Sequence, residues 1–402
     1  MVNLAAIQTA LGRIRDAIYL TPCNLSHSLS EQAGNSVFLK MENLQRTGAF
    51  KERGALNKIL TLTAEERKKG CLCASAGNHA QAVSYHATRL GIHAEIWMPL
   101  TTPLIKVSST RGFGGEVVLQ GANYDEASQG ALARGRETGM TFLHPFDDEA
   151  VIAGQGTIGL ELLEQVPDLD AVVTPIGGGG LAAGVACALK ESRPGLRVVG
   201  VQTARLPSMK VAVAEGQPVL LPSATTIADG IAVRQAGKVT LPLITRYLDD
   251  IVTVDEEEIA NAILLLLERE KTLAEGAGAT ALAAVLNHRV GVNGKRVAVL
   301  VCGGNIDVTL LSRIIERGLV KDGRQVRLRV HLPDHPGALH KLTAVFTSHR
   351  ANIVQTHHDR SYYGVNLGDT VIELTMETRG QEHIDELCSA LGANGYLYER
   401  VQ

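Results

Sequence analysis

The sequence has no long apolar run, little net charge and few cysteines, and each of these absences excludes a class of protein. No uninterrupted apolar stretch approaches the roughly 18 residues of a membrane span, so we expect no membrane-spanning helix. The 39 basic and 42 acidic residues leave a formal net charge of -3, which argues against binding to nucleic acid or to an anionic membrane. We therefore expect a small-molecule ligand.

The cysteines and the first residues indicate a cellular compartment. Six cysteines in 402 residues, with Cys71 and Cys73 too close to bridge without strain, do not form a disulfide framework. The segment from Met1 to Gln8 lacks the charged stretch followed by an apolar stretch that marks an export signal. We therefore expect a soluble protein in the reducing cytoplasm.

Short apolar runs alternate with helical stretches through most of the chain, after a first helix that the apolar spacing predicts from Leu4 to Tyr19. Near-continuous runs followed by glycine-bearing turns are typical of parallel strands buried on both faces. The runs lie at residues 37–40, 71–74, 94–98, 116–119, 171–174, 197–201 and 296–301. The fold class is therefore α/β, and the length of the chain predicts two or three folded units.

The pattern changes after Leu319, where a polar segment predicts a linker at residues 321–325. The elements expected beyond it are a strand at 326–332, a helix at 338–349, strands at 352–358 and 370–377, a helix at 382–391 and a strand at 396–401. This βαββαβ order is the ferredoxin-like arrangement. We do not expect it to supply the catalytic core.

The first chemical motif is the glycine-bearing turn Thr47 to Ala55, which opens a helix and contains Lys51. A lysine near a helix N-terminus and partly removed from water has a lowered pKa, so it can act as a nucleophile or a base. The alternative is a solvated lysine in a first turn, which is the commoner case for a lysine taken alone. The context of Lys51 must decide between them.

Two further motifs each follow a predicted strand. The small residues of the loop Ser75 to His79 leave backbone N–H groups free for a carboxylate or phosphate, and Asn78 can donate to a phenolate-type oxygen. An ordinary N-cap turn is the alternative.

The four glycines at 177–180 can wrap a phosphate with backbone amides, although a purely structural glycine turn is also possible. The next strand ends in Gln202 instead of an acidic residue, which favours a monophosphate over NAD.

The fourth motif, Val301 to Asn305, ends the last predicted strand of the core. Its Cys302 is either a buried small apolar residue or a neutral partner for a ring nitrogen, and spacing leaves both open. The order of the four motifs resembles fold-type II pyridoxal-phosphate enzymes of the threonine ammonia-lyase (threonine/serine dehydratase) kind, with serine racemase as a close relative. The resemblance spans roughly residues 1–320.

The resemblance implies an arrangement of the fold and a role for each motif. Two open parallel-sheet domains are expected, the larger from residues 1–40 and 146–320 and the smaller from 41–145, with the cofactor in the cleft between them. Pyridoxal 5′-phosphate would form a Schiff base with Lys51. The other cofactor-binding residues implied are Phe50, Asn78 at the ring oxygen O3′, Gly177, Gly178, Gly179, Gly180 and Leu181 at the phosphate, and Cys302 at the ring nitrogen. Those implied for the substrate carboxylate are Ser75, Ala76, Gly77, Asn78 and His79.

The same resemblance implies a reaction. The cofactor would act as an electron sink and Lys51 as the base that removes the α-proton. Loss of the β-hydroxyl of L-threonine, and of L-serine, would give a 2-oxo acid and ammonia, which is carbon–nitrogen lyase chemistry. The implied metabolic setting is amino-acid metabolism such as isoleucine biosynthesis. Which of the two hydroxy amino acids is preferred stays open.

Two departures from the family pattern favour a lyase over the alternative, a serine racemase-like enzyme. Cys302 stands where serine is common, and either neutral residue suits elimination better than transamination. Ala76 stands where serine racemase has the serine that acts on the opposite face of the substrate, so racemisation should be lost. The strand end from Val199 to Ala204 also lacks the carboxylates of the racemase's divalent-metal site, and we predict no metal there.

Residues 326–402 resemble an ACT domain, which implies allosteric control by an amino acid and a homodimer or homotetramer. The effector-binding residues expected from its first loop are Asp334, Gly337, Ala338 and Leu339. The histidines of this region lie on different elements without ligand spacing, so we expect no metal cluster. A nucleotide-dependent oxidoreductase and a catalytically inactive amino-acid sensor are the competing hypotheses from other classes. Both are weakened because Lys51, Asn78 and the glycine loop occur together.

Overall fold

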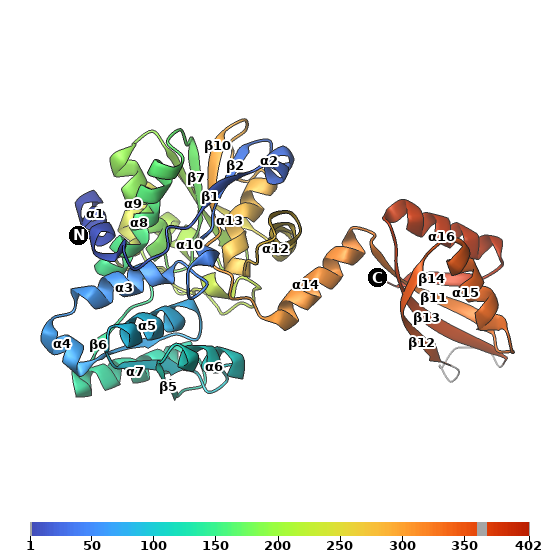
Figure 1. Ribbon diagram of the computed structural model, residues 1–402, viewed down its shortest axis with the longest axis horizontal. Coiled ribbons are helices and arrows are strands. Elements are labelled where there is room, and N and C mark those ends of the chain that lie inside the picture. The colour runs from blue at the N-terminus through green and yellow to red at the C-terminus, as the bar shows by residue number, and fades with distance from the viewer. Residues whose placement is uncertain (1, 360–367, 402) are drawn as a thin grey trace. The chain divides into compact units, whose positions relative to one another are not determined.

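The computed structural model describes residues 2–359 and 368–401 (Figure 1). The chain divides into two compact units, residues 1–307 and 308–402. Of the expected ACT region at 326–402, residues 360–367 and 402 lie outside the described residues. The first unit itself contains a larger and a smaller sheet, each covered by helices (Figure 1).

The larger sheet has the strand order β1-β2-β10-β7-β8-β9. All neighbours in it are parallel except β1 and β2. Its strands are β1 (Cys23–Ser26), β2 (Ser36–Lys40), β7 (Ala171–Pro175), β8 (Arg197–Thr203), β9 (Asp250–Val254) and β10 (Arg296–Leu300). The central strand β7 is buried along its whole length, which explains why its sequence reads as one apolar run.

Helices pack on both faces of this sheet (Figure 1). They are α1 (Leu4–Ile14), α2 (His27–Ala33), α3 (Lys51–Thr61), α8 (Glu149–Gln165), α9 (Gly180–Ser192), α10 (Ser208–Glu215), α11 (Thr240–Tyr247), α12 (Glu256–Glu270) and α13 (Gly276–Leu286), with short 3-10 turns η1 (Glu42–Leu44) and η2 (Asp229–Ile231). Small residues allow close helix packing: a Cβ added at Gly184 of α9 would lie 2.3 Å from the carbonyl oxygen of Ile152 in α8. The helices α8 and α9 therefore pack closely against each other, and α9 contacts the strand β7.

The smaller sheet has the strand order β5-β4-β3-β6 and is parallel throughout. Its strands are β3 (Cys71–Ala74), β4 (Ala94–Met98), β5 (Glu116–Leu119) and β6 (Thr141–Phe142). Its helices are α4 (Ala64–Lys69), α5 (Asn78–Arg89), α6 (Leu104–Gly112) and α7 (Tyr124–Thr138). This sheet encloses its own apolar core, which includes Val83, Ile96 and Leu143.

The C-terminal unit has the expected βαββαβ order. After α14 (Val308–Lys321) come β11 (Gln325–Pro333), α15 (Ala338–Ser348), β12 (Asn352–Asp359), β13 (Asp369–Glu377), α16 (Gln381–Ala393) and β14 (Leu397–Val401). The antiparallel sheet order is β12-β13-β11-β14, with β12 and β14 at its edges. Alternate residues of β11 and β13, such as Leu328 and Leu374, face the helices and form the core. The ferredoxin-like prediction is confirmed.

One helix boundary differs from the expectation, because α1 ends at Ile14, before the expected Tyr19. The compact units divide at residues 307 and 308, so the helix α14, on which Leu310, Leu311 and Ile314 share one face, belongs to the second unit. The turn between α14 and β11, at residues 322–324, falls within the linker expected at 321–325. Among the described residues, no helix combines the length and apolarity needed to cross a membrane.

Candidate functional site

The site lies at the carboxyl ends of three parallel strands, where ligands bind in open α/β sheets. The loop Ser75–His79 follows β3, the glycines at 177–180 follow β7, and Cys302 follows β10. These segments, together with Phe50, Lys51 and Leu181, line one cavity of about 890 Å³. The cofactor- and substrate-site residues expected from the sequence are therefore brought together.

The turn that carries Lys51 is fastened to the end of β10. The backbone N–H of Phe50 donates to the carbonyl oxygen of Cys302 at 3.0 Å, and that of Gly304 donates to Gly48 at 2.9 Å. Gly48 adopts a φ of +76°, and a Cβ there would lie 2.6 Å from Asn305 Oδ1. This glycine is therefore required for the turn to approach the strand end, and Lys51 starts α3 from a fixed position.

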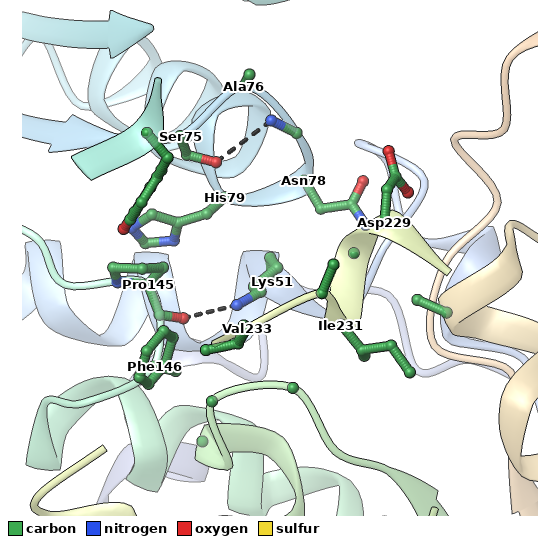
Figure 2. A pocket seen from close by; sticks show the side chains of 18 of the residues that line it. Lys51, Ser75, Ala76, Asn78, His79, Pro145, Phe146, Asp229, Ile231 and Val233 are labelled. Carbon is green, nitrogen blue, oxygen red and sulfur yellow. Dashed lines mark hydrogen bonds between the residues drawn. The ribbon is translucent and has the colours of Figure 1, made fainter. Parts of the chain in front are cut away.

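The amine of Lys51 is partly buried and reaches across the cavity. Its Nζ donates to the carbonyl oxygen of Pro145 at 2.6 Å and lies 5.2 Å from the centre of the Phe50 ring (Figure 2). Burial lowers the pKa of Lys51 to about 8, although the nearby Cys302 and Glu275 act in the opposite direction. A larger fraction of this amine is therefore neutral near pH 7 than of an ordinary lysine, which is the form that attacks a carbonyl carbon.

The loop after β3 presents its backbone at the start of α5. Ser75 Oγ accepts from the backbone N–H of Gly77 at 3.3 Å, and Ala76 packs against the core of the smaller sheet. His79 Nε2 donates to the carbonyl oxygen of Leu143 at 2.9 Å, which fixes its tautomer. Burial lowers the pKa of His79 to about 3, so the ring is neutral. Its buried Nδ1 has no hydrogen-bond partner, which leaves one acceptor unsatisfied at this cavity.

Asn78 joins this loop to the segments that follow β10 and precede α13, and both ends of its amide are hydrogen-bonded. Asn305 Nδ2 donates to Asn78 Oδ1 at 2.8 Å, and Asn78 Nδ2 donates to Glu275 Oε1 at 2.7 Å. Asn305 ends the fourth motif but has no role predicted from the sequence, and Glu275 lies outside all four motifs. A single carboxylate before the small-residue helix α13 gave no signal beyond that of an N-cap.

The glycine loop turns tightly into α9, which starts at Gly180. A Cβ at Gly178 would lie 2.3 Å from the Phe146 ring, and one at Gly180 would lie 2.8 Å from the Phe146 carbonyl oxygen. Gly179 adopts a φ of +100°, where a side chain would be strained. Glycine is therefore required on steric grounds as well, and the loop leaves backbone N–H groups at the N-terminus of a helix, where anions bind.

Cys302 is buried in the same cavity. Burial raises the pKa of its thiol well above the ordinary value, with Glu275 adding to the effect, so the group is neutral. A neutral thiol is a weak partner for a ring nitrogen and does not force that nitrogen to carry a proton. This charge state fits the role implied for Cys302.

Charged side chains beneath α3 hold the helix that starts at Lys51. The Arg53 guanidinium pairs with Glu42 at 2.8 Å and with Glu161 at 2.5 Å, and Lys40 reaches Glu161 at 2.6 Å. Arg53, Lys40 and Glu42 are completely buried. The Arg53 guanidinium lowers the pKa of the Glu42 carboxyl against the opposing effect of burial.

The expected effector residues lie in the other compact unit. The backbone N–H of Asp334 donates to Gly368 at 2.8 Å, and Gly337 precedes α15 with a φ of +88°. Ala338 is buried, whereas Leu339 is 38% exposed. Asp334 and Gly337 therefore lie in the turn between β11 and α15, and Ala338 and Leu339 are the first residues of α15. Among the described residues, no group of three or more histidine, cysteine or acidic side chains could hold a metal ion.

The cavity fits a phosphorylated aldehyde. Lys51 supplies the amine, and the glycine loop lines the cavity in a position that a Cβ at Gly178 would not allow, because it would clash with the Phe146 ring. Asn78 supplies an amide hydrogen for a ring oxygen, and neutral Cys302 suits a ring nitrogen. The fold and the site together define a pyridoxal-phosphate enzyme of the two-domain α/β kind.

Comparison with known proteins agrees with this class. Residues 14–303 match the family described as pyridoxal-phosphate dependent enzyme, and residues 326–392 match the ACT domain. The chain belongs to the pyridoxal-phosphate dependent enzyme family and carries a C-terminal ACT domain. Its cofactor is pyridoxal 5′-phosphate.

Proteins similar to this chain are named threonine ammonia-lyase, threonine deaminase and serine racemase. An L-threonine ammonia-lyase of Thermotoga maritima is 48% identical over 98% of each chain. The processed form of threonine deaminase isoform 2 from Solanum lycopersicum is 37% identical, with a TM-score of 0.75, over 78% of this chain and 86% of that one. Maize serine racemase is 34% identical, also with a TM-score of 0.75, over 80% of this chain and 98% of its own.

Proposed function

We propose that this enzyme eliminates the β-hydroxyl of L-threonine, and of L-serine, as water. Hydrolysis of the released enamine takes up one water and gives 2-oxobutanoate or pyruvate and ammonia, so the net reaction releases ammonia alone. The observation that carries the proposal is the convergence of Lys51, Asn78 and the glycine loop on one cavity. The similarity to named threonine ammonia-lyases over nearly the whole chain supports it. The proposed activity belongs to the carbon–nitrogen lyases.

The residues of the cavity have separate roles in this proposal. Bound pyridoxal phosphate supplies an electron sink for the bonds at the α-carbon of the substrate. Lys51 holds the cofactor and then accepts the α-proton at Nζ, because burial lowers its pKa toward the working pH. The backbone amides of the loop Ser75–His79 bind the substrate carboxylate at the start of α5. The glycines at 177–180 hold the phosphate.

The same assignments favour elimination over racemisation. Ala76 has no group that can exchange a proton with the substrate, so the base proposed is Lys51 alone. Incubation with L-serine should yield pyruvate with D-serine below a few per cent of the product. Chiral chromatography of the reaction measures this directly. D-serine forming as fast as pyruvate would favour the racemase-like alternative.

We also propose that an amino acid binds at the turn before α15 and at the first residues of that helix, Asp334, Gly337, Ala338 and Leu339, and controls activity. The ACT match supports this regulation. In this proposal the edge strands β12 and β14 pair between copies of the chain in a homodimer or homotetramer. Analytical ultracentrifugation of the full chain tests this assembly, and a monomer at assay concentrations would contradict it.

Measurement of 2-oxo acid formation, with each of the proteinogenic amino acids added in turn, tests the control and identifies the effector. Asp334→Ala should abolish the response to the amino acid that acts. Glu386→Gln, an exposed substitution on α16, is the matched control and should respond normally. An unchanged response in Asp334→Ala would contradict the proposed effector turn.

A further inference from the structure

The orientation of the Asn78 amide is determined by its neighbours. Asn305 Nδ2 donates to the carbonyl oxygen of Thr47 at 2.8 Å, and a backbone carbonyl can only accept. The Asn305 atom at this position must therefore be the nitrogen. Because that nitrogen also faces Asn78 at 2.8 Å, the Asn78 atom there must be the oxygen, Oδ1. Asn78 Nδ2 then lies at the other end of the amide.

Glu275 completes this chain of hydrogen bonds. Its Oε1 accepts from Asn78 Nδ2 at 2.7 Å, and the backbone N–H of Asn305 also donates to the carboxylate. An amide nitrogen carries two hydrogens, so Glu275 uses one and the other is left for a group in the cavity. Glu275 therefore allows the nitrogen of Asn78, and not its oxygen, to be the atom presented to a ligand.

The backbone makes room for this contact and holds Glu275 in place. A Cβ at Gly303 would lie 2.5 Å from Glu275 Oε1 and 3.1 Å from Asn78 Nδ2, so glycine is required between them. The backbone N–H of Glu275 donates to the carbonyl oxygen of Gly303 at 3.0 Å at the start of α13. With 4% of its surface exposed, Glu275 cannot exchange these partners for water.

We infer that Glu275 is a positioning residue for the cofactor. Together with Asn305, it holds the Asn78 amide so that an Nδ2–H faces the ring oxygen O3′ of bound pyridoxal phosphate. Without Glu275 only Asn305 opposes rotation of the amide, and such rotation would turn Oδ1, an acceptor, toward that negatively charged oxygen. This inference rests on the proposed cofactor site at Lys51 and Asn78.

The test measures the affinity and the visible absorption band of bound pyridoxal phosphate in the full chain. Glu275→Leu removes the acceptor at similar volume and should weaken cofactor binding about tenfold and shift the band. Glu275→Gln keeps an acceptor for Asn78 Nδ2, so it should stay within about threefold of the wild type and keep the original band. Glu164→Gln, an exposed substitution on α8, is the matched control and should change neither.

A double-mutant cycle with Asn78→Ala separates positioning from a general structural effect. If Glu275 acts through Asn78, Glu275→Leu should change the affinity less than twofold when Asn78 is already alanine. If the effects of the two substitutions on cofactor affinity are additive, or if the absorption band of Glu275→Leu is not shifted, the inference is overturned. Borohydride reduction followed by peptide mass analysis of the wild type keeps the two proposals apart. If Lys51 carries the label but Glu275→Leu changes neither the affinity nor the band, only this inference is refuted. Absence of label on Lys51 refutes the proposed site.

Discussion

Lys51 Nζ donates a hydrogen bond to the carbonyl oxygen of Pro145 at 2.6 Å, which links the first residue of α3 to the segment that follows β6. The cofactor proposal therefore requires the amine to exchange this carbonyl for a covalent bond to the cofactor. The contact keeps the amine inside the cavity before the cofactor arrives, so little side-chain entropy remains to be lost.

Attachment of the cofactor should depend on pH in a direction set by the Lys51 pKa. Burial lowers that pKa from 10.5 to about 8, and only the neutral amine attacks the aldehyde. The rate at which cofactor-free protein recovers its absorption band should therefore rise with pH up to about 8 and then level off. Stopped-flow mixing with pyridoxal phosphate measures it. A rate that keeps rising toward pH 10 would show an ordinary lysine.

Gly178→Ala should weaken binding of pyridoxal phosphate by about tenfold or more, because the new Cβ would lie 2.3 Å from the Phe146 ring and displace the phosphate loop. Equilibrium dialysis against the cofactor measures the change. Gly195→Ala is the matched control, since its Cβ would meet no atom within 4 Å. Adding Phe146→Leu to Gly178→Ala should restore part of the affinity. Equal affinities for the two alanine variants would contradict the assignment of the loop.

Arg53→Met should destabilise the catalytic unit by roughly 3–5 kcal/mol, because it leaves Glu42 and Glu161 buried without their shared cation. Urea denaturation followed by tryptophan fluorescence reports the loss. Lys295→Met is the comparison, since both side chains of its pair with Asp170 are exposed and the pair should contribute no more than about 1 kcal/mol. Similar losses of unfolding free energy in the two variants would mean that burial does not determine how much the Arg53 ion pairs contribute to stability.

Two ion pairs lie among the residues that line the cavity, Lys106 with Asp229 at 2.9 Å and Arg234 with Asp125 at 3.4 Å. Each joins a helix of the smaller sheet to the segment around η2. Because these side chains are largely exposed, salt should screen both pairs. We expect Lys106→Met to raise the KM for L-threonine a few-fold at low ionic strength and to have little effect in 1 M salt. A salt-independent effect would contradict this explanation.

The parts of the fold that could be predicted from sequence are those with a local signal. The buried strands β7 and β10 read as apolar runs because both of their faces are covered, and Lys51 and the glycine loop occur in compact motifs. The end of α1 was misjudged because apolar spacing alone does not fix where a helix ends, and α14 was not predicted.

The remaining parts of the site depend on contacts between distant segments. The role of Glu275 depends on its hydrogen bond with Asn78, which forms only because the fold brings the start of α13 beside that residue. The role of Pro145 likewise depends on the contact of its carbonyl oxygen with Lys51. Arg53, two residues after Lys51, was assigned no role from the sequence, because its partners Glu42 and Glu161 come from other elements. Such residues have no sequence pattern of their own, since tertiary packing defines their environment.

The most direct measurement of the central claim is the site of cofactor attachment. The purified protein, Lys51→Ala and the control Lys58→Ala are each reduced with borohydride, digested and analysed by mass spectrometry. Lys58 is a suitable control because it lies on the same helix as Lys51, α3, and pairs with Asp148. The reduced cofactor should be found on Lys51 in the wild type and in Lys58→Ala. Lys51→Ala should carry no label and form 2-oxo acid from L-threonine at less than about one thousandth of the wild-type rate. Label on another lysine, or full turnover by Lys51→Ala, would contradict the account.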